Sequence, residues 1–145
     1  MNAHGSQEYL RNAVMTASPE RLQLMLFDGA IRFATRGREA VVADDLEGAF
    51  NALDRAQRIT LQLAAGMNRE VNPDLVDQMA ALYNFVYSRL VDGCVRRQIE
   101  PIDEALRVLR HLRETWILLM DKIAEHRASN SLEASAPRPS LSIEG

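Results

Sequence analysis

Histidines and glutamates are the first candidates for chemistry in this chain, because a helical bundle can hold a di-iron site. Such a site needs the spacing Glu-x-x-His twice, together with two further inward glutamates. The chain has three histidines, His4, His111 and His126, and no glutamate stands three residues before either of the last two. The sequence therefore predicts no metal site, and a metal-dependent bundle enzyme would need ligands that it lacks.

The single cysteine, Cys94, is the only candidate for a thiol nucleophile. Arg96 and Arg97 follow it and would favour a thiolate, but no histidine lies near it in the sequence to act as a base. We expect a buried, unreactive thiol. Two acid pairs, 44–45 and 103–104, fall at predicted helix starts, where the helix dipole explains them. With no phosphate-binding loop or dinucleotide motif, the sequence predicts a protein that is not an enzyme and needs no cofactor.

Prolines mark the starts of three of the helices that must position any site. They are Pro19, Pro73 and Pro101. Proline suits the first turn of a helix, where its missing N–H would be unpaired in any case. Ser18 and Asn72 precede two of these prolines as natural N-caps. A fourth start lies where Asp44 and Glu47 have the spacing of a capping box.

Apolar residues recur at helical spacing between these starts, and no segment shows the alternation of a strand. The predicted helices cover about residues 19–43, 46–66, 73–97 and 101–126. Short links between them indicate an all-α fold, an antiparallel four-helix bundle. We expect an N-terminal arm over 1–17, a helical bundle domain over 18–126 and a disordered C-terminal tail over 127–145, which is rich in Ser, Ala and Pro.

Length and charge narrow the class of protein further. The 145 residues suffice for one domain, and 20 acidic against 17 basic side chains give a net charge of −3. This mild, mixed charge argues against a nucleic-acid partner. No basic and apolar leader opens the chain and no apolar run is long enough for membrane insertion. We expect a cytoplasmic protein.

The first predicted helix carries more apolar residues than one stripe requires. Beside the stripe that runs from Leu22 to Val41, Leu24, Phe27 and Ile31 form a second line, roughly 100° around the helix. Further apolar residues lie off the main stripes of the third and fourth helices: Leu75, Leu82, Phe85, Val108, Ile117 and Leu118. They form either a wide core or a groove for a helical or unfolded segment of another protein, and both readings are open.

Glycines inside the predicted helices leave a similar choice. They are Gly29, Gly37, Gly48 and Gly93. Each costs about 1 kcal/mol relative to alanine, so something must offset that loss. Close approach of two helices and a shallow groove for another backbone are equally good explanations at this point.

An N-terminal arm and four motifs that follow it in order resemble the flagellin export chaperones of the FliS family. The arm contains Tyr9. The motifs are a T-A-S-P-x-x-L start over 16–22, an m-L-y-D-G-A helix over 25–30, an L-Y-x-y-x-y-x-R-L segment over 82–90 and R-E-T-W over 113–116. The third-helix motif has Phe85 where tyrosine is frequent in the family. The resemblance covers about residues 9–126.

The resemblance implies a chaperone that binds the disordered C-terminal segment of flagellin, prevents premature polymerisation and delivers the subunit to the flagellar export gate. It also implies an arm that can cover the groove when it is empty, with Tyr9 contributing to handover. The candidate partner-binding residues are Tyr9, Leu10, Leu24, Phe27, Ile31, Tyr83 and Tyr87. On this hypothesis, Phe27→Glu weakens partner binding and leaves the helices intact.

Two alternatives concern self-association. A structural homo-oligomeric helical bundle without a client would use its wide apolar stripes to close the oligomer. An arm-swapped homodimer of the chaperone is also possible on the sequence, because the arm around Tyr9 and Leu10 is the only spare apolar segment near the first helix.

Overall fold

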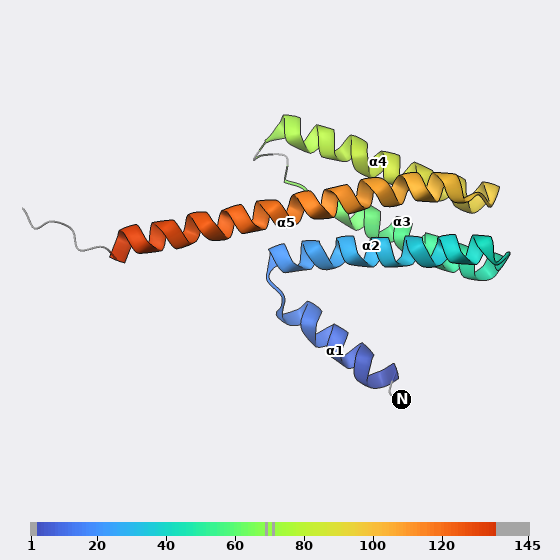
Figure 1. Cartoon of the computed structure of the whole chain (residues 1–145), viewed down its shortest axis with the longest axis horizontal. Helices are drawn as coiled ribbons and strands as arrows, with labels where there is room; N and C mark the ends of the chain where they lie inside the picture. Colours follow the sequence, from blue (N-terminus) through green and yellow to red (C-terminus); the bar gives the residue numbers. More distant parts are fainter. Residues whose placement is uncertain (1–2, 69, 71, 136–145) are drawn as a thin grey trace, which may run out of the picture.

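The computed structural model describes residues 3–68, 70 and 72–135, and it is built of helices (Figure 1). The helices are α1 (Ala3–Thr16), α2 (Pro19–Val42), α3 (Leu46–Ala65), α4 (Pro73–Arg96) and α5 (Ile99–Ser135). The predicted all-α class is confirmed, and the starts and ends of α2, α3 and α4 lie within one residue of the predicted ones. Helix α5 begins two residues earlier than expected, so that Pro101 lies in its first turn, where proline is tolerated.

Side-chain caps fix the starts of three helices. Ser18 and Asn72 cap α2 and α4 as predicted, and each side-chain oxygen accepts a hydrogen bond at 3.2 Å from the backbone N–H three residues on. In α3 the cap is Asp45 and not Asp44: its carboxylate accepts from the N–H of Gly48 at 3.0 Å. Asp44 has φ of 58° and belongs to the preceding turn, whereas Asp45 has the extended backbone that a cap requires.

Helices α2 to α5 form an antiparallel bundle in which each packs against two neighbours. Helix α2 lies between α3 and α5, and α4 lies between the same two on the other side, with little contact between α2 and α4. The ring order is therefore α2, α3, α4, α5. It follows that the outer face between α2 and α3 lies opposite the outer face between α4 and α5.

The core consists of two clusters along the bundle. The aliphatic cluster is made of small and branched residues: Ala30, Ala34, Leu53, Ala56, Val86, Leu90, Ile102, Ala105, Leu106 and Leu109. The aromatic cluster has larger members: Phe27, Leu63, Tyr83 and Leu112, with Trp116 packed against them. The aliphatic cluster lies toward the α2–α3 and α4–α5 turns, and the aromatic cluster lies toward the end where α2 and α4 begin.

Two helical glycines sit where helices approach closely. A Cβ on Gly37 would lie 2.5 Å from Cγ of Leu53 in α3, and one on Gly93 would lie 2.5 Å from Cγ1 of Ile102 in α5. Both distances are far shorter than van der Waals contact, so alanine does not fit without movement. Close helix packing explains these two glycines, and a groove for another backbone is not needed.

Hydrogen bonds and ion pairs tie α2 to α5 along its length. Arg38 and Arg113 form salt bridges with Asp103 and Asp28. The indole N–H of Trp116 donates to the backbone oxygen of Glu20 at 3.1 Å. Asp103 therefore has a structural partner, and its position at the start of α5 needs no catalytic explanation.

The predicted tail begins later than expected. Helix α5 continues to Ser135, so residues 127–135 are helical and not part of a disordered tail. The segment contains no proline or glycine before Pro137, and it includes Ala, Leu, Glu and Arg, which are good helix formers. Residues 136–145 lie outside the described part of the chain.

The N-terminal arm is itself helical. Helix α1 projects away from the bundle near the start of α2 and packs along none of the other helices (Figure 1). The sequence analysis did not predict this helix. Within the described residues, the apolar side chains of α1 are therefore left without a partner in the bundle.

Candidate partner-binding surface

The second apolar line of α2 lies mainly inside the bundle. Phe27 is 1% exposed and Leu24 is 8% exposed, while Ile31 is partly buried against the aliphatic cluster. Of the two readings that the sequence left open, the core is the correct one for Leu24 and Phe27, and neither is accessible as a partner-binding residue in this structure. They continue through Ala30 to Ala34 as the buried stripe of α2, because α3 and α5 cover this side of the helix.

Several residues of the core stripe that the sequence predicted for α2 are less buried than Leu24 and Phe27. Leu22, Met25, Leu26 and Phe33 are half-buried, at the flanks of the stripe and not at its centre. Both lines are apolar at helical spacing, so periodicity alone does not say which one faces the neighbouring helices.

The two tyrosines proposed on α4 have different surroundings. Tyr83 is 2% exposed and belongs to the aromatic cluster with Phe27. Burial raises the pKa of its hydroxyl to about 12, and a hydrogen bond with Gln23 opposes part of that rise. Tyr87 is half-buried on the same helix. Tyr83 is thus a core residue, which a partner on the outside of the bundle does not reach.

The two arm residues are accessible. Tyr9 is 78% exposed, and Leu10 is also exposed on the projecting helix α1. The arm does not cover an empty groove in this structure, contrary to what the resemblance implies for the unoccupied state. Val14 and Met15 are exposed on the same helix, so the arm offers apolar area to a partner.

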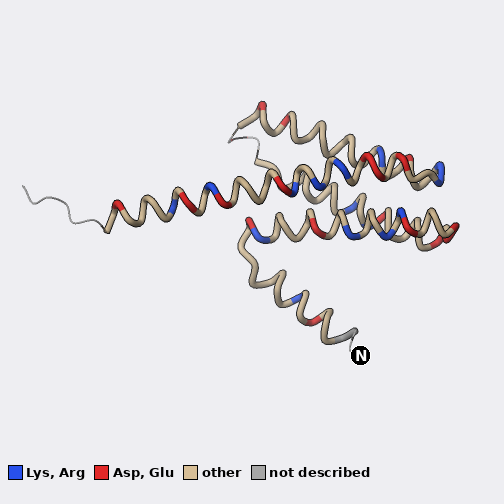
Figure 2. The backbone as a smooth tube through the Cα atoms, viewed as in Figure 1, with Lys and Arg blue, Asp and Glu red and all other residues tan. Residues whose placement is uncertain are grey.

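A line of exposed apolar side chains runs along the outer side of α4. Leu75, Leu82 and Phe85 are 53%, 37% and 42% exposed, and their spacing of seven and three residues places them on one side of the helix. Figure 2 shows acidic residues in the first turns of α4, Asp74 and Asp77, followed by a long uncharged stretch over residues 78–88. Leu82 and Phe85 lie within this uncharged stretch.

Contacts of Arg89 show which neighbour this line borders. Arg89 lies one turn beyond Phe85 with its guanidinium 6.0 Å from the ring centroid, and it reaches Glu104 of α5 at 3.8 Å. Since Phe85 and Arg89 share a side of α4, the line lies on the flank that faces α5. Glu104 is therefore engaged in an ion pair and does not form an acid pair with Asp103 for catalysis.

Helix α5 exposes an apolar residue near the end of the bundle where α4 begins. Leu119 stands two turns beyond Leu112 on the same side of the helix, but Leu112 is buried and Leu119 is 45% exposed. The difference arises because α5 runs on past the end of the bundle (Figure 1). We call Leu75, Leu82, Phe85 and Leu119 the α4/α5 apolar surface. The sequence analysis noted its three α4 members as off-stripe residues but missed Leu119, which the seven-residue spacing from Leu112 could have indicated.

The candidates for catalysis do not form a site. Cys94 is partly buried, and burial followed by the charge of Asp54 raises the pKa of its thiol, as expected for an unreactive cysteine. His111 and His126 are exposed on α5. Among residues 3–68, 70 and 72–135, no three His, Cys, Asp or Glu side chains gather as metal ligands.

A search of the same ranges gives no helix with the length and apolar character of a bilayer span.

Comparison with known proteins decides the family. The family model described as "Flagellar protein FliS" matches residues 1–123 of the chain. The chain belongs to the FliS family. The flagellar secretion chaperone FliS of Bacillus subtilis (strain 168) is 32% identical over 108 residues, which cover 74% of this chain and 80% of that protein. The corresponding protein of Salmonella typhimurium is 31% identical over 112 residues, covering 77% and 83%.

A solved structure agrees with the fold of this FliS chain. It is described as the crystal structure of a flagellar chaperone from bacteria, and it superposes with a TM-score of 0.67 at 22% identity. The match covers 81% of this chain and 96% of the other. Membership of this family makes the chain a flagellar secretion chaperone and not an enzyme, as the sequence analysis predicted.

Proposed function

We propose that this FliS protein is a cytoplasmic chaperone that binds the disordered C-terminal segment of flagellin on its α4/α5 apolar surface. Binding keeps that segment from premature polymerisation and delivers the subunit to the flagellar type III export gate. The observation that carries the proposal is the exposed apolar line on α4, of which Leu82 and Phe85 lie in the uncharged stretch 78–88 around the buried Tyr83. A segment that folds as an amphipathic helix would lay its apolar side along this line.

The energy available from this surface sets a requirement on the rest of the site. Its four side chains are about half exposed, so covering them yields roughly 3–6 kcal/mol at about 1.5–3 kcal/mol for a fully buried side chain. Ordering a disordered partner costs about 2–5 kcal/mol or more. The α4/α5 apolar surface alone would therefore bind weakly, and further apolar area is needed for useful affinity.

Helix α1 and the free part of α5 can supply that area. Tyr9, Leu10 and Met15 are exposed on α1, and Leu118 is exposed on α5 close to Leu119. Helix α1 joins the bundle at the end where α2 begins, and α5 runs on past the same end (Figure 1). We infer that the client segment contacts the α4/α5 apolar surface first and that α1 closes over it, with Tyr9 also acting in handover at the export gate.

Isothermal titration with a peptide from the C-terminus of a flagellin of the same organism tests the proposal. We expect Leu82→Glu to weaken binding at least about tenfold, because a charge is placed where apolar contact is needed. Leu61→Glu is the matched control, since Leu61 is a similarly exposed leucine, 52% accessible, on α3. Circular dichroism should give the same helical content for both variants.

Two results would contradict the proposal. Equal peptide affinity for Leu82→Glu and the wild-type protein would show that the α4/α5 apolar surface is not the site. Undiminished binding of flagellin that lacks its C-terminal region would show that another part of flagellin is recognised.

A second copy of the chain is the competing occupant of the same surface. The detached helix α1 has the geometry that an arm-swapped dimer needs, with exposed apolar residues and no partner helix in its own bundle. Light scattering distinguishes an arm-swapped dimer from a chaperone that is free to bind its client. A dimer that becomes a monomer when residues 1–17 are removed would favour the arm-swapped dimer. A monomer at all concentrations leaves the surface free for the client.

A further inference from the structure

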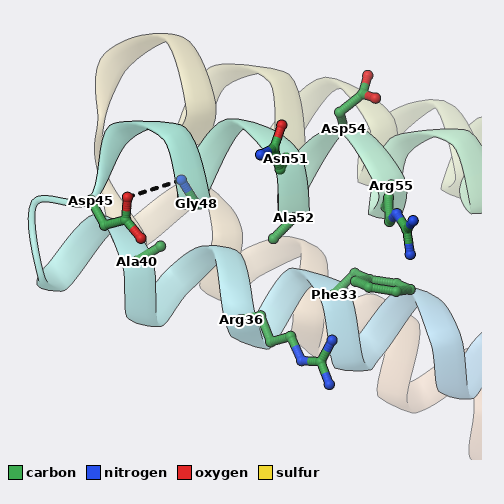
Figure 3. Close-up of a pocket in the computed structure, with 9 residues that line it drawn as sticks. All are labelled: Phe33, Arg36, Ala40, Asp45, Gly48, Asn51, Ala52, Asp54 and Arg55. Carbon is green, nitrogen blue, oxygen red and sulfur yellow. Dashed lines mark hydrogen bonds between the residues drawn. The ribbon is translucent and has the colours of Figure 1, made fainter. Parts of the chain in front are cut away.

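The opposite face of the bundle, between α2 and α3, holds a hollow with a different chemistry. Its volume is about 610 Å³, and it is lined on one side by Phe33 and Arg36 of α2 and on the other by Arg55 of α3 (Figure 3). The rest of its lining is small or polar, including Asp45, Ala52 and Asp54. We call this hollow the arginine pocket.

Three guanidinium groups gather on the Phe33 ring, and two of them belong to Arg36 and Arg55, which line the arginine pocket. Those of Arg32, Arg36 and Arg55 lie 5.2, 5.5 and 5.2 Å from the centroid of Phe33. The ring face attracts each cation, but the three like charges repel one another. Phe33 is itself held in place, because it packs against the aliphatic cluster.

The carboxylates of the pocket are already engaged elsewhere. Asp45 caps α3 by accepting from the N–H of Gly48, and Asp54 is paired with Arg58 at 3.0 Å. Within the ranges that the structure describes, Arg32, Arg36 and Arg55 form no salt bridge. Arg38, on the other side of the same helix, does pair with a carboxylate, that of Asp103.

The geometry points to a second docking site, in which the arginine pocket binds an acidic segment of a partner protein. Guanidinium groups bind carboxylates through paired, charge-assisted hydrogen bonds. A segment with carboxylates on either side of an apolar side chain would relieve the repulsion between the arginines and cover the Phe33 ring. A nucleic acid is disfavoured, because the whole chain carries a net charge of −3 and the arginines form one local group and not a stripe.

This site is independent of the proposed flagellin site. In the ring order of the helices, the α2/α3 face and the α4/α5 face are on opposite sides of the bundle. One chaperone molecule could therefore hold an apolar client on one side and an acidic partner on the other.

Fluorescence anisotropy of the full chain with a labelled peptide of Glu, Leu and Ala repeats tests the inference. We expect saturable binding in low salt that is lost as salt screens the charges. Arg36→Glu and Arg55→Glu should each weaken binding at least about tenfold, since each replaces an attraction by a repulsion. Arg110→Glu is the control, because Arg110 is exposed on α5, away from Phe33, and changes the net charge equally.

Three outcomes would overturn the inference. The first is an acidic-peptide affinity that is the same for Arg55→Glu and Arg110→Glu, which would make the attraction non-specific. The second is tighter, variant-sensitive binding of a single-stranded DNA oligonucleotide. The third is loss of flagellin-peptide binding in Arg36→Glu and Arg55→Glu, which would show that the arginine pocket is part of the flagellin site. Unchanged flagellin-peptide binding in both variants supports two separate sites. This holds whether or not flagellin binds on the α4/α5 apolar surface.

Discussion

The two ends of the bundle are built from different side chains and leave different surfaces. At the end with the α2–α3 and α4–α5 turns, the aliphatic cluster contains alanines, and glycines let the helices approach closely. At the other end, the aromatic cluster contains Phe27 and Tyr83, and α4 diverges from α5 toward its start (Figure 1). Small residues thus produce the tight end and large residues the wide one.

Both ends leave apolar side chains uncovered: Val42, Leu46, Phe50 and Val95 are exposed at the tight end, and a second group is exposed at the wide end. Leu75, Leu82 and Leu119 are exposed just outside the aromatic cluster, and α1 with the free part of α5 extends from the same end. The comparison indicates a difference in packing along the bundle. The tight end is packed through small residues, whereas the wide end sets its exposed apolar side chains beside a buried aromatic layer and the projecting parts of α1 and α5.

The largest expected effect is that of removing the buried aromatic ring at the wide end. Phe27→Ala should lower the free energy of unfolding by about 3–5 kcal/mol, because it leaves a cavity among Leu63, Tyr83 and Leu112. Phe85→Ala, which removes a half-exposed ring on the outer side of α4, should change it by less than about 1 kcal/mol. Urea denaturation of both variants measures the contrast.

Burial also reverses the effect expected of Phe27→Glu from the sequence. A carboxylate at a position that is 1% exposed would be unpaired in the core, so this variant should unfold the protein and not merely weaken partner binding. Equal losses of stability for Phe27→Ala and Phe85→Ala would show that the interior and the outer surface of the wide end are not distinct.

The starts and ends of the helices follow largely from local sequence signals, whereas the side of each helix that is buried in the core does not. The caps Ser18 and Asn72 and the first-turn prolines define helix starts through short-range hydrogen bonding and fixed backbone geometry, so they are readable in one segment. Whether Phe27 or Leu22 faces the core depends on where α3 and α5 lie. That is a long-range fact, and two apolar lines on one helix leave it undecided.

The next largest effect tests close packing at the tight end. Gly37→Ala should destabilise the protein by about 1–3 kcal/mol, because a Cβ would overlap the buried side chain of Leu53 and outweigh the gain in helix propensity. Thermal unfolding monitored by circular dichroism measures the loss. The loss should arise at the contact between α2 and α3, where the added Cβ meets Leu53.

Gly29→Ala is the matched control on the same helix. The nearest atom to its added Cβ is Cδ1 of Ile59 at 3.3 Å, the far end of a side chain that is only partly buried. Helix propensity then dominates, and the variant should be neutral or more stable by up to about 1 kcal/mol. A similar loss for both variants would contradict the view that only the tight end depends on glycine.

The candidate site was predictable in part for the same reason as the fold. The sequence marked Leu75, Leu82 and Phe85 as lying off the main stripe of their own helix, which is local information, but the binding residues it proposed on that helix were Tyr83 and Tyr87. It did not reveal that Tyr83 is buried, or that α1 projects outward. The arginine pocket was also missed, because Phe33 and Arg55 meet only when α2 and α3 pack together.

The smallest expected effect tests whether the interior of the wide end is dry. Burial favours the neutral hydroxyl of Tyr83, so the folded protein keeps this proton up to about pH 12, whereas the unfolded chain releases it near pH 10. Between these values the unfolded state binds fewer protons, and stability must fall as pH rises, by about 1 kcal/mol at pH 11. Urea titrations of the wild-type protein and Tyr83→Phe, at about pH 9 and about pH 11, should show a smaller fall for the variant. An equal fall in both would mean that water reaches the hydroxyl, and the aromatic cluster would then be part of the open surface and not the closed layer behind Leu82.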